Sequence, residues 1–215
     1  MNRKVMGMKI AVLGAESTGK STLVQSLTQA LQAAGTPCIA ISEFLREWCD
    51  LHQRTPRPDE QARIAHEQTR RIGAASGPVV VTDTTALITA IYSDLLFQDT
   101  SLYPDALDDL RTFTHVLVTG LDLPWVADGH QRDSPEGQQA FHQRLQSVLQ
   151  EHNIRYSMVW GTGPLRLEAA LRIVHPDHKA DDGQAAEQYA RWLGRCEKCS
   201  DATCEHQLFR SLLAG

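Results

Sequence analysis

The segment Gly14–Ser21 constrains the fold of this chain more than any other part of its sequence. It reads Gly-Ala-Glu-Ser-Thr-Gly-Lys-Ser and fits the pattern G-x-x-x-x-G-K-[ST]. The apolar run Met8–Gly14 predicts a strand buried on both faces, and Lys20–Ala34 carries leucines at helical spacing. A glycine-rich loop between such a strand and helix is typical of a phosphate-binding loop, because backbone N–H groups and the helix N-terminus can surround an anion.

We therefore expect this loop to bind the phosphates of ATP or a related nucleotide. Lys20 would neutralise the β- and γ-phosphate oxygens, and the Ser21 hydroxyl would ligate Mg²⁺. Asp83 ends a run of valines, so it is the expected acidic partner near the magnesium ion; a helix N-cap is its alternative role. The residues expected to bind the nucleotide are Gly14, Glu16, Ser17, Thr18, Gly19, Lys20, Ser21 and Thr22.

Alternating strand and helix patterns predict an α/β fold of the P-loop NTPase class. Further strands are expected over residues 38–41, 78–83 and 115–119, with a weaker fifth over 155–160. Helices are expected over residues 20–34, 43–51, 59–72, 86–97, 104–110 and 138–152. This order predicts a three-layer α/β/α arrangement around a mostly parallel five-stranded sheet, with ligands bound at the carboxyl ends of the strands.

Length, charge and hydropathy narrow the classes of function. The 215 residues suit one large domain with an appendage, and we place a P-loop domain over 1–178 and a helical tail over 179–215. The net charge of −5 disfavours nucleic-acid binding, because phosphate contacts need a basic surface. No apolar run reaches the roughly 18 residues of a membrane helix, so we expect a cytoplasmic protein without a membrane partner.

The loop after the fourth predicted strand bears on the kind of P-loop protein. GTPases recognise guanine with an Asn-Lys-x-Asp segment. The only asparagines here are Asn2 and Asn153, and neither begins such a segment, so the sequence disfavours a GTPase. A small-molecule kinase needs a cationic lid, and Arg132 could fold over the transferring phosphoryl group or remain a solvated side chain. Trp125 either packs in the core or stacks on a base.

Three segments of the chain resemble the ribosylnicotinamide kinase domain of the NadR family. Gly14–Thr22 matches that family's loop, G-x-E-S-[ST]-G-K-S-T, and Glu43–Arg46 is similar to its E-[YF]-x-R stretch. Pro124–Gly129, followed by Arg132, resembles its P-W-V-A-D-G-x-R lid segment, and the matches span about Lys9–Ile173. The resemblance implies an ATP-dependent kinase that phosphorylates the ribose 5′-hydroxyl of nicotinamide riboside.

The resemblance also implies roles for side chains on the acceptor side. Glu43 and Arg46 would lie near the acceptor nucleoside, and Trp125 and Asp128 would shape its pocket. Arg132 would belong to the lid and, with Lys20, stabilise charge on the transferring phosphoryl group.

The proton acceptor is left open at this stage. Either Asp83 or Glu43 would take the proton of the acceptor hydroxyl. The chain departs from the family at the third strand, where the family usually reads D-x-D and this sequence reads Asp83-Thr84-Thr85.

The C-terminal segment carries a possible zinc site. Its spacing is C-x2-C-x4-C-x-H, a set of soft and borderline ligands of the kind structural Zn²⁺ prefers. His175 or His178 is an alternative source of the fourth ligand, and a metal-free helical tail is the alternative to the zinc site. The candidate ligands are Cys196, Cys199, Cys204 and His206. Three other histidines are expected on helix surfaces, without a role: His66, His142 and His152.

Two functions of different class remain open. The leading hypothesis is a nucleoside kinase that uses ATP and Mg²⁺ and acts on a small-molecule nucleoside. The alternative is a nucleotide-dependent switch or sensor, in which nucleotide binding rearranges the lid and the tail contacts an unidentified protein partner.

Overall fold

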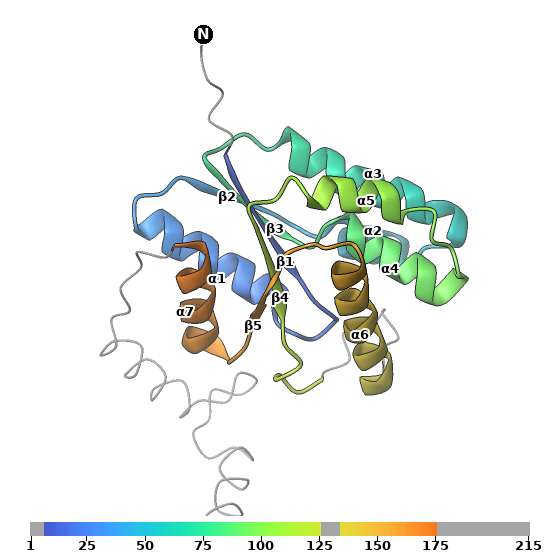
Figure 1. Ribbon diagram of the computed structural model, residues 1–215. Helices are drawn as coiled ribbons and strands as arrows, with labels where there is room; N and C mark the ends of the chain where they lie inside the picture. Colours follow the sequence, from blue (N-terminus) through green and yellow to red (C-terminus); the bar gives the residue numbers. More distant parts are fainter. Residues whose placement is uncertain (1–6, 126–133, 176–215) are drawn as a thin grey trace, which may run out of the picture. The chain divides into compact units, whose positions relative to one another are not determined.

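Five strands form one parallel sheet, which confirms the predicted fold class (Figure 1). The computed structural model describes residues 7–125 and 134–175, and the chain divides into two compact units, Met1–Trp160 and Gly161–Gly215. The strands are β1 (Met8–Leu13), β2 (Cys38–Ile41), β3 (Val79–Asp83), β4 (His115–Thr119) and β5 (Ser157–Val159). Their order across the sheet is β2-β3-β1-β4-β5, so the first strand lies at the centre.

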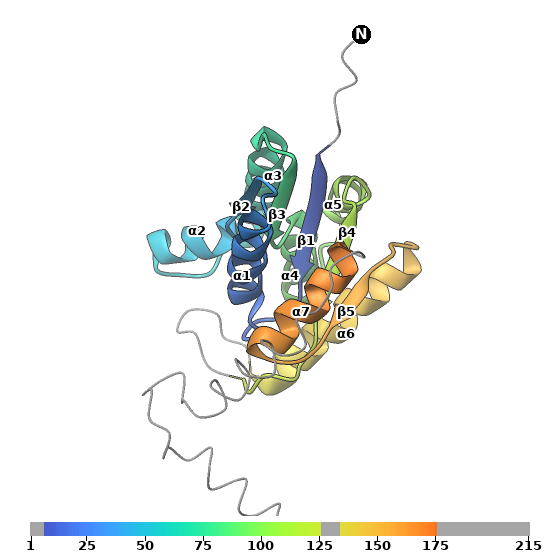
Figure 2. The ribbon, with the colours of Figure 1, turned by 90° about the vertical axis from the view of Figure 1, so that its left-hand side faces the viewer.

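Helices of the first unit cover both faces of this sheet. Their bounds are α1 (Lys20–Ala33), α2 (Phe44–His52), α3 (Pro58–Ala74), α4 (Ala86–Phe97), α5 (Tyr103–Leu110) and α6 (Pro135–Glu151). Helix α1 lies on one side of the sheet, and α4, α5 and α6 lie on the other (Figures 1 and 2). Ala11 and Leu13 of β1 belong to the main apolar core together with Leu87, Ile91 and Phe141 of these helices. The central strand is thus apolar on both faces because both are covered.

Two helices differ from the sequence prediction. Helix α6 begins three residues earlier than predicted, because the Ser134 hydroxyl accepts a hydrogen bond from the Gly137 N–H at 3.2 Å and Pro135 occupies the first turn. Helix α7 (Gly163–Val174), in the second unit, was not predicted. Its first turn also contains a proline, Pro164, whose fixed φ suits that position.

The prediction that His142 lies on a helix surface is wrong. Only 8% of its surface is exposed, because it follows Gln138 by one turn on the face of α6 that also buries Phe141 and Leu145. His66 and His152 are exposed, as predicted.

Several predictions lie outside the described residues. They are the roles of Asp128 and Arg132, the boundary after residue 178, and the cysteine-rich candidate zinc site. Within residues 7–125 and 134–175, no helix is long and apolar enough to cross a membrane.

Candidate nucleotide site

The loop from β1 to α1 has a backbone that depends on glycine. Gly14 has φ 152°, and a Cβ atom built on it would lie 2.1 Å from Oγ1 of Thr119 on β4. Gly19, the residue before α1, adopts the left-handed conformation with φ 73°, and Ser17 has φ 55°. Glycine adopts such angles at little cost, so both glycines of the motif stand where the loop has a positive φ.

Two threonine hydroxyl groups fasten the loop to the sheet. Oγ1 of Thr18 lies 2.7 Å from the carbonyl oxygen of Ala15 and 2.7 Å from Oγ1 of Thr119. The Thr119 hydroxyl in turn lies 3.2 Å from the carbonyl oxygen of Leu13. Both threonines are buried, so the loop is held between the ends of β1 and β4.

The motif lysine stays at the loop. Nζ of Lys20 donates to the carbonyl oxygen of Ala15 at 2.8 Å, and only 6% of the residue is exposed. Its ammonium group therefore lies beside the backbone that the motif predicts to surround phosphate. Ser21 and Thr22, which follow it in the first turn of α1, are both exposed.

Ser21 and Asp83 meet where β1 and β3 end. The strands pair with Val12 opposite Asp83, which brings the Asp83 carboxylate to the start of α1. Oγ of Ser21 donates to Oδ2 of Asp83 at 2.5 Å. The aspartate is 5% exposed, and its second oxygen, Oδ1, is buried without a hydrogen-bond partner in the described part of the chain.

This pair of groups fits Mg²⁺. Hydroxyl and carboxylate oxygens are the ligands that this ion takes in nucleotide sites. A buried carboxylate oxygen without a donor costs free energy, and a bound cation would remove that cost. The alternative role of Asp83 as a helix N-cap is wrong, because Thr85 is the residue that caps α4, accepting from the Leu87 N–H at 3.3 Å.

The residue that caps α4 is the one at which the sequence departs from the D-x-D pattern. Thr85 stands where the family usually has a second aspartate, and it is 1% exposed. The preceding residue, Thr84, has φ 70°, and its N–H donates to the carbonyl oxygen of Val12 at 3.1 Å. The chain thus turns from β3 into α4 directly after Asp83.

Glu43 lies at the same edge of the sheet as Asp83. Strand β2 runs beside β3 with Ile41 opposite Thr82; Asp83 is the last residue of β3, and Glu43 follows the end of β2 by two residues. Glu43 is 8% exposed, and its Oε2 lies 3.7 Å from Nε of the more exposed Arg46. The structure thus places the two predicted acceptor-side residues of this segment next to each other, beside the strand that carries Asp83.

Two residues at the loop were not predicted from the sequence. The Tyr92 hydroxyl donates to Oε1 of Glu16 at 2.8 Å, and Nε2 of Gln138 donates to the Glu16 carbonyl oxygen at 2.6 Å. Glu16 itself is buried. Tyr92 and Gln138 come from α4 and α6, so two helices on the face of the sheet opposite α1 hold this part of the loop.

Of the remaining predicted residues, Trp125 is half-buried at the end of the first described stretch. Within the described ranges, no group of three or more His, Cys, Asp or Glu side chains could hold a metal ion. The predicted zinc ligands lie beyond residue 175, outside those ranges.

Comparisons with known proteins bear on the family and the fold. A family model described as an AAA domain matches residues 9–166. Comparison with curated proteins finds no match.

Among solved structures, a NadR protein in complex with NAD and AMP-PNP has a TM-score of 0.64 and 22% identity, and the match covers 82% of this chain and 51% of that one. A NadR protein in complex with NR has a TM-score of 0.65 and 21% identity, covering 82% and 52%. A deoxyadenosine kinase from M.mycoides, with the products dCMP and a flexible dCDP bound, has a TM-score of 0.54 and 14% identity, covering 79% and 100%. This chain spans about half the length of the NadR structures, and these similarities establish a shared fold.

Proposed function

The chain belongs to the AAA domain family, and on that premise we propose that it is an ATP-dependent nucleoside kinase that phosphorylates nicotinamide riboside. One observation carries the proposal: the phosphate loop, the Ser21–Asp83 pair and Glu43 lie at the same edge of the sheet.

The nucleotide half of the proposed site consists of the loop and the groups around it. The loop backbone and Lys20 would bind the β- and γ-phosphates of ATP. Ser21 and Asp83 would hold the Mg²⁺ ion, which when bound would neutralise negative charge on the phosphates. Gly14 and Gly19 would let the loop backbone approach the phosphates closely.

The acceptor half centres on Glu43. Asp83 already accepts from Ser21 and fits the metal, so we assign the general base to Glu43, on the neighbouring strand end. The carboxylate of Glu43 would take the proton of the ribose hydroxyl as its oxygen attacks the γ-phosphate. Arg46 would orient that carboxylate and contact the nucleoside.

Two lines of support favour nicotinamide riboside as the acceptor. The segments Glu43–Arg46 and Pro124–Gly129 resemble those of the ribosylnicotinamide kinase domain. A NadR protein solved with NR has the same fold as this chain, and so has a deoxyadenosine kinase, which supports a nucleoside as the acceptor class.

The test is ADP release from Mg·ATP with nicotinamide riboside, a panel of other nucleosides and a control without acceptor. We expect nicotinamide riboside to stimulate release most strongly. Glu43→Gln should lower the stimulated rate by about 10²- to 10⁴-fold, as for a lost general base, and leave nucleotide affinity unchanged. Lys20→Ala should lose most turnover while remaining folded.

Other outcomes separate the alternatives. Stimulation by a different nucleoside would keep the kinase and change its substrate. Tight nucleotide binding with slow hydrolysis that no acceptor stimulates would contradict the kinase and support the nucleotide-dependent switch.

A further inference from the structure

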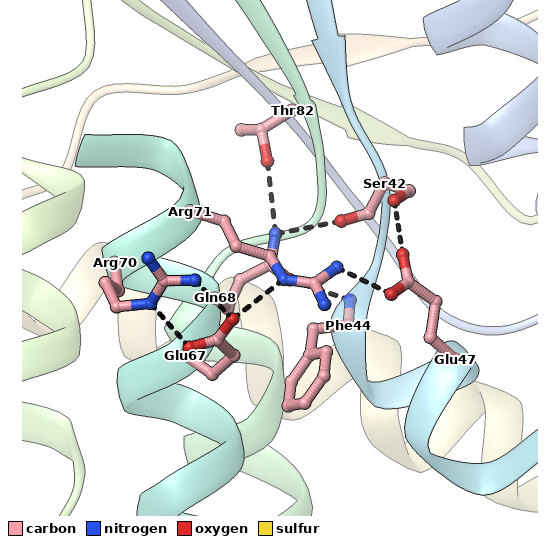
Figure 3. Close-up of polar contacts among 8 residues, drawn as sticks. All are labelled: Ser42, Phe44, Glu47, Glu67, Gln68, Arg70, Arg71 and Thr82. Atoms are coloured by element: carbon pink, nitrogen blue, oxygen red, sulfur yellow. Dashed lines mark hydrogen bonds and ion pairs between the residues drawn. The ribbon is translucent and has the colours of Figure 1, made fainter. Parts of the chain in front are cut away.

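Gln68, a buried residue of α3, forms hydrogen bonds to the backbone on both sides of Glu43, the proposed general base. Only 3% of Gln68 is exposed. Its Oε1 accepts from the Phe44 N–H at 2.8 Å, and its Nε2 donates to the Ser42 carbonyl oxygen at 3.3 Å (Figure 3). Ser42 and Phe44 are the neighbours of Glu43, so a single amide binds the backbone immediately before and immediately after that carboxylate.

The same amide reaches the strand that carries Asp83. Nε2 of Gln68 lies 3.4 Å from Oγ1 of Thr82, the residue before Asp83 (Figure 3). The Thr82 hydroxyl in turn donates to the Thr84 carbonyl oxygen at 2.6 Å. Thr82 is fully buried. Gln68 therefore connects the ends of β2 and β3, the two strands that present Glu43 and Asp83.

Gln68 also satisfies the first N–H group of α2. Glu43 is the N-cap residue of α2, and its side chain makes no capping hydrogen bond. The N–H groups of a first helical turn have no partner within the helix, and a capping side chain usually accepts from them. Here the N–H of Phe44, the first residue of α2, donates to Gln68, and the Glu43 carboxylate lies 3.7 Å from Nε of Arg46.

A second brace between α3 and α2 lies one turn farther along. Arg71 donates to Oε2 of Glu47 at 2.6 Å and to Oε1 of Glu67 at 3.0 Å, and its guanidinium lies 4.4 Å from the centre of the Phe44 ring (Figure 3). Glu47 in turn accepts from the Ser42 hydroxyl at 2.5 Å. This brace is partly exposed, and exposed ion pairs contribute little, so the buried amide of Gln68 carries most of the restraint on Glu43.

We propose that Gln68 is a positioning residue for phosphoryl transfer: it sets where the Glu43 carboxylate lies relative to Asp83. The inference rests on the proposed kinase function and on Glu43 as its base. Because the amide offers one acceptor and two donor hydrogens to these partners, an apolar side chain of similar length would leave the Phe44 N–H and the Ser42 carbonyl group without them.

The first experiment measures steady-state kinetics of Gln68→Met with nicotinamide riboside, or with whichever nucleoside of the panel stimulates the native protein most. We expect kcat/KM for the nucleoside to fall by about 10- to 100-fold, because small misplacements of a reacting group have effects of this size. The KM for ATP should stay within about twofold of the native value, a split that general loosening of the fold would not produce.

Gln32→Met is the control for loss of a hydrogen bond from a glutamine amide to the backbone of β2. Nε2 of Gln32 donates to the Cys38 carbonyl oxygen at 2.8 Å, so this variant removes a bond from a glutamine amide to the backbone at the opposite end of the same strand, β2. We expect native kcat/KM values for this variant. An equal loss in both variants, or equal losses for ATP and the nucleoside in Gln68→Met, would overturn the inference.

A double-mutant cycle tests whether Gln68 acts through Glu43. In a Glu43→Gln background, Gln68→Met should change kcat/KM for the nucleoside by no more than about twofold, because the group it positions is already gone. Losses that multiply would overturn the inference. If Gln68→Met fails to fold, Thr82→Val removes the second link with little change of shape, and native kinetics in that variant would overturn the inference equally.

The cycle also separates the two proposals. No acceptor stimulation in the native protein would refute the proposed function and the inference with it. Native nucleoside kinetics in Glu43→Gln would refute Glu43 as the base, and the inference with it, while leaving the kinase function standing. A strong defect in Glu43→Gln alongside native kinetics in Gln68→Met would refute the inference alone.

Discussion

Gly14 shows how a single residue fixes the conformation of the phosphate loop. Its φ is 152°, and a Cβ atom at this position would lie only 2.1 Å from Oγ1 of Thr119, which leaves no room for a side chain. Thr119 is held in place, because its hydroxyl also lies 2.7 Å from that of Thr18. The first glycine of the motif is therefore required by the neighbouring strand as well as by the phosphate.

We predict that Gly14→Ala lowers both stability and nucleotide affinity. Displacing Thr119 would loosen Thr18 and, with it, the loop that carries Lys20. Nucleotide titration and thermal unfolding measure the two effects.

The control is Gly73→Ala in α3, where an added Cβ would meet no atom within 4 Å. This change should be neutral or stabilising by up to about 1 kcal/mol, since alanine favours a helix over glycine. Unchanged nucleotide affinity in Gly14→Ala would contradict the role given to the loop geometry.

The residues that the sequence identified lie in contiguous motifs, whereas those it missed act over long separations. Gly14–Thr22 and Asp83 could be found because strand, loop and helix signals adjoin them. Tyr92 and Gln138 lie 76 and 122 residues from Glu16 along the chain, and no local pattern connects them. Gln68 could not be identified from the sequence either. It is one polar residue of a helix, and its partners Phe44 and Ser42 lie 24 and 26 residues away along the chain.

At the scale of elements, predicted strands and helices agree closely with the structure, except where caps or packing decide. Helix α4 and strand β4 have the predicted bounds, because most of their residues are apolar. Helix α6 starts early through Ser134, and its buried face is wide enough to include His142. A histidine on such a face could not be told from a surface histidine by residue type alone.

The burial of His142 makes the stability of the folded protein depend on pH. Burial lowers the pKa of His142 below its ordinary value near 6.5, and its Nδ1 has no hydrogen-bond partner in the described part of the chain. The unfolded chain therefore binds a proton more readily than the folded protein does. The resulting stability is present above about pH 6.5 and is lost as the pH falls below that value.

We predict that the free energy of unfolding declines between pH 7 and pH 5 and that His142→Leu reduces this slope. Denaturant unfolding at a series of pH values measures it. A residual slope is expected from His115, whose pKa burial also lowers. The exposed His152→Gln should match the native slope, and an unchanged slope in His142→Leu would rule out the assigned cause.

At the scale of the whole molecule, strand order turns scattered residues into one candidate site. Strands β2, β3 and β1 are neighbours in the sheet although long segments separate them in the chain. Glu43, Asp83 and the loop after β1 therefore meet at one edge. The sequence predicted the parallel sheet, because alternating elements imply it. It did not specify that β3 lies between β1 and β2, since strand order depends on packing of the complete unit.

The most direct test of the account is identification of the product. The native protein would be incubated with Mg·ATP and nicotinamide riboside, and ADP, phosphate and phosphorylated nucleoside would be quantified together by chromatography and mass spectrometry. The account predicts one phosphorylated nucleoside for each ADP, with almost no free phosphate, and no such product in Lys20→Ala. ADP accompanied by an equal amount of free phosphate, with no phosphorylated nucleoside, would contradict it.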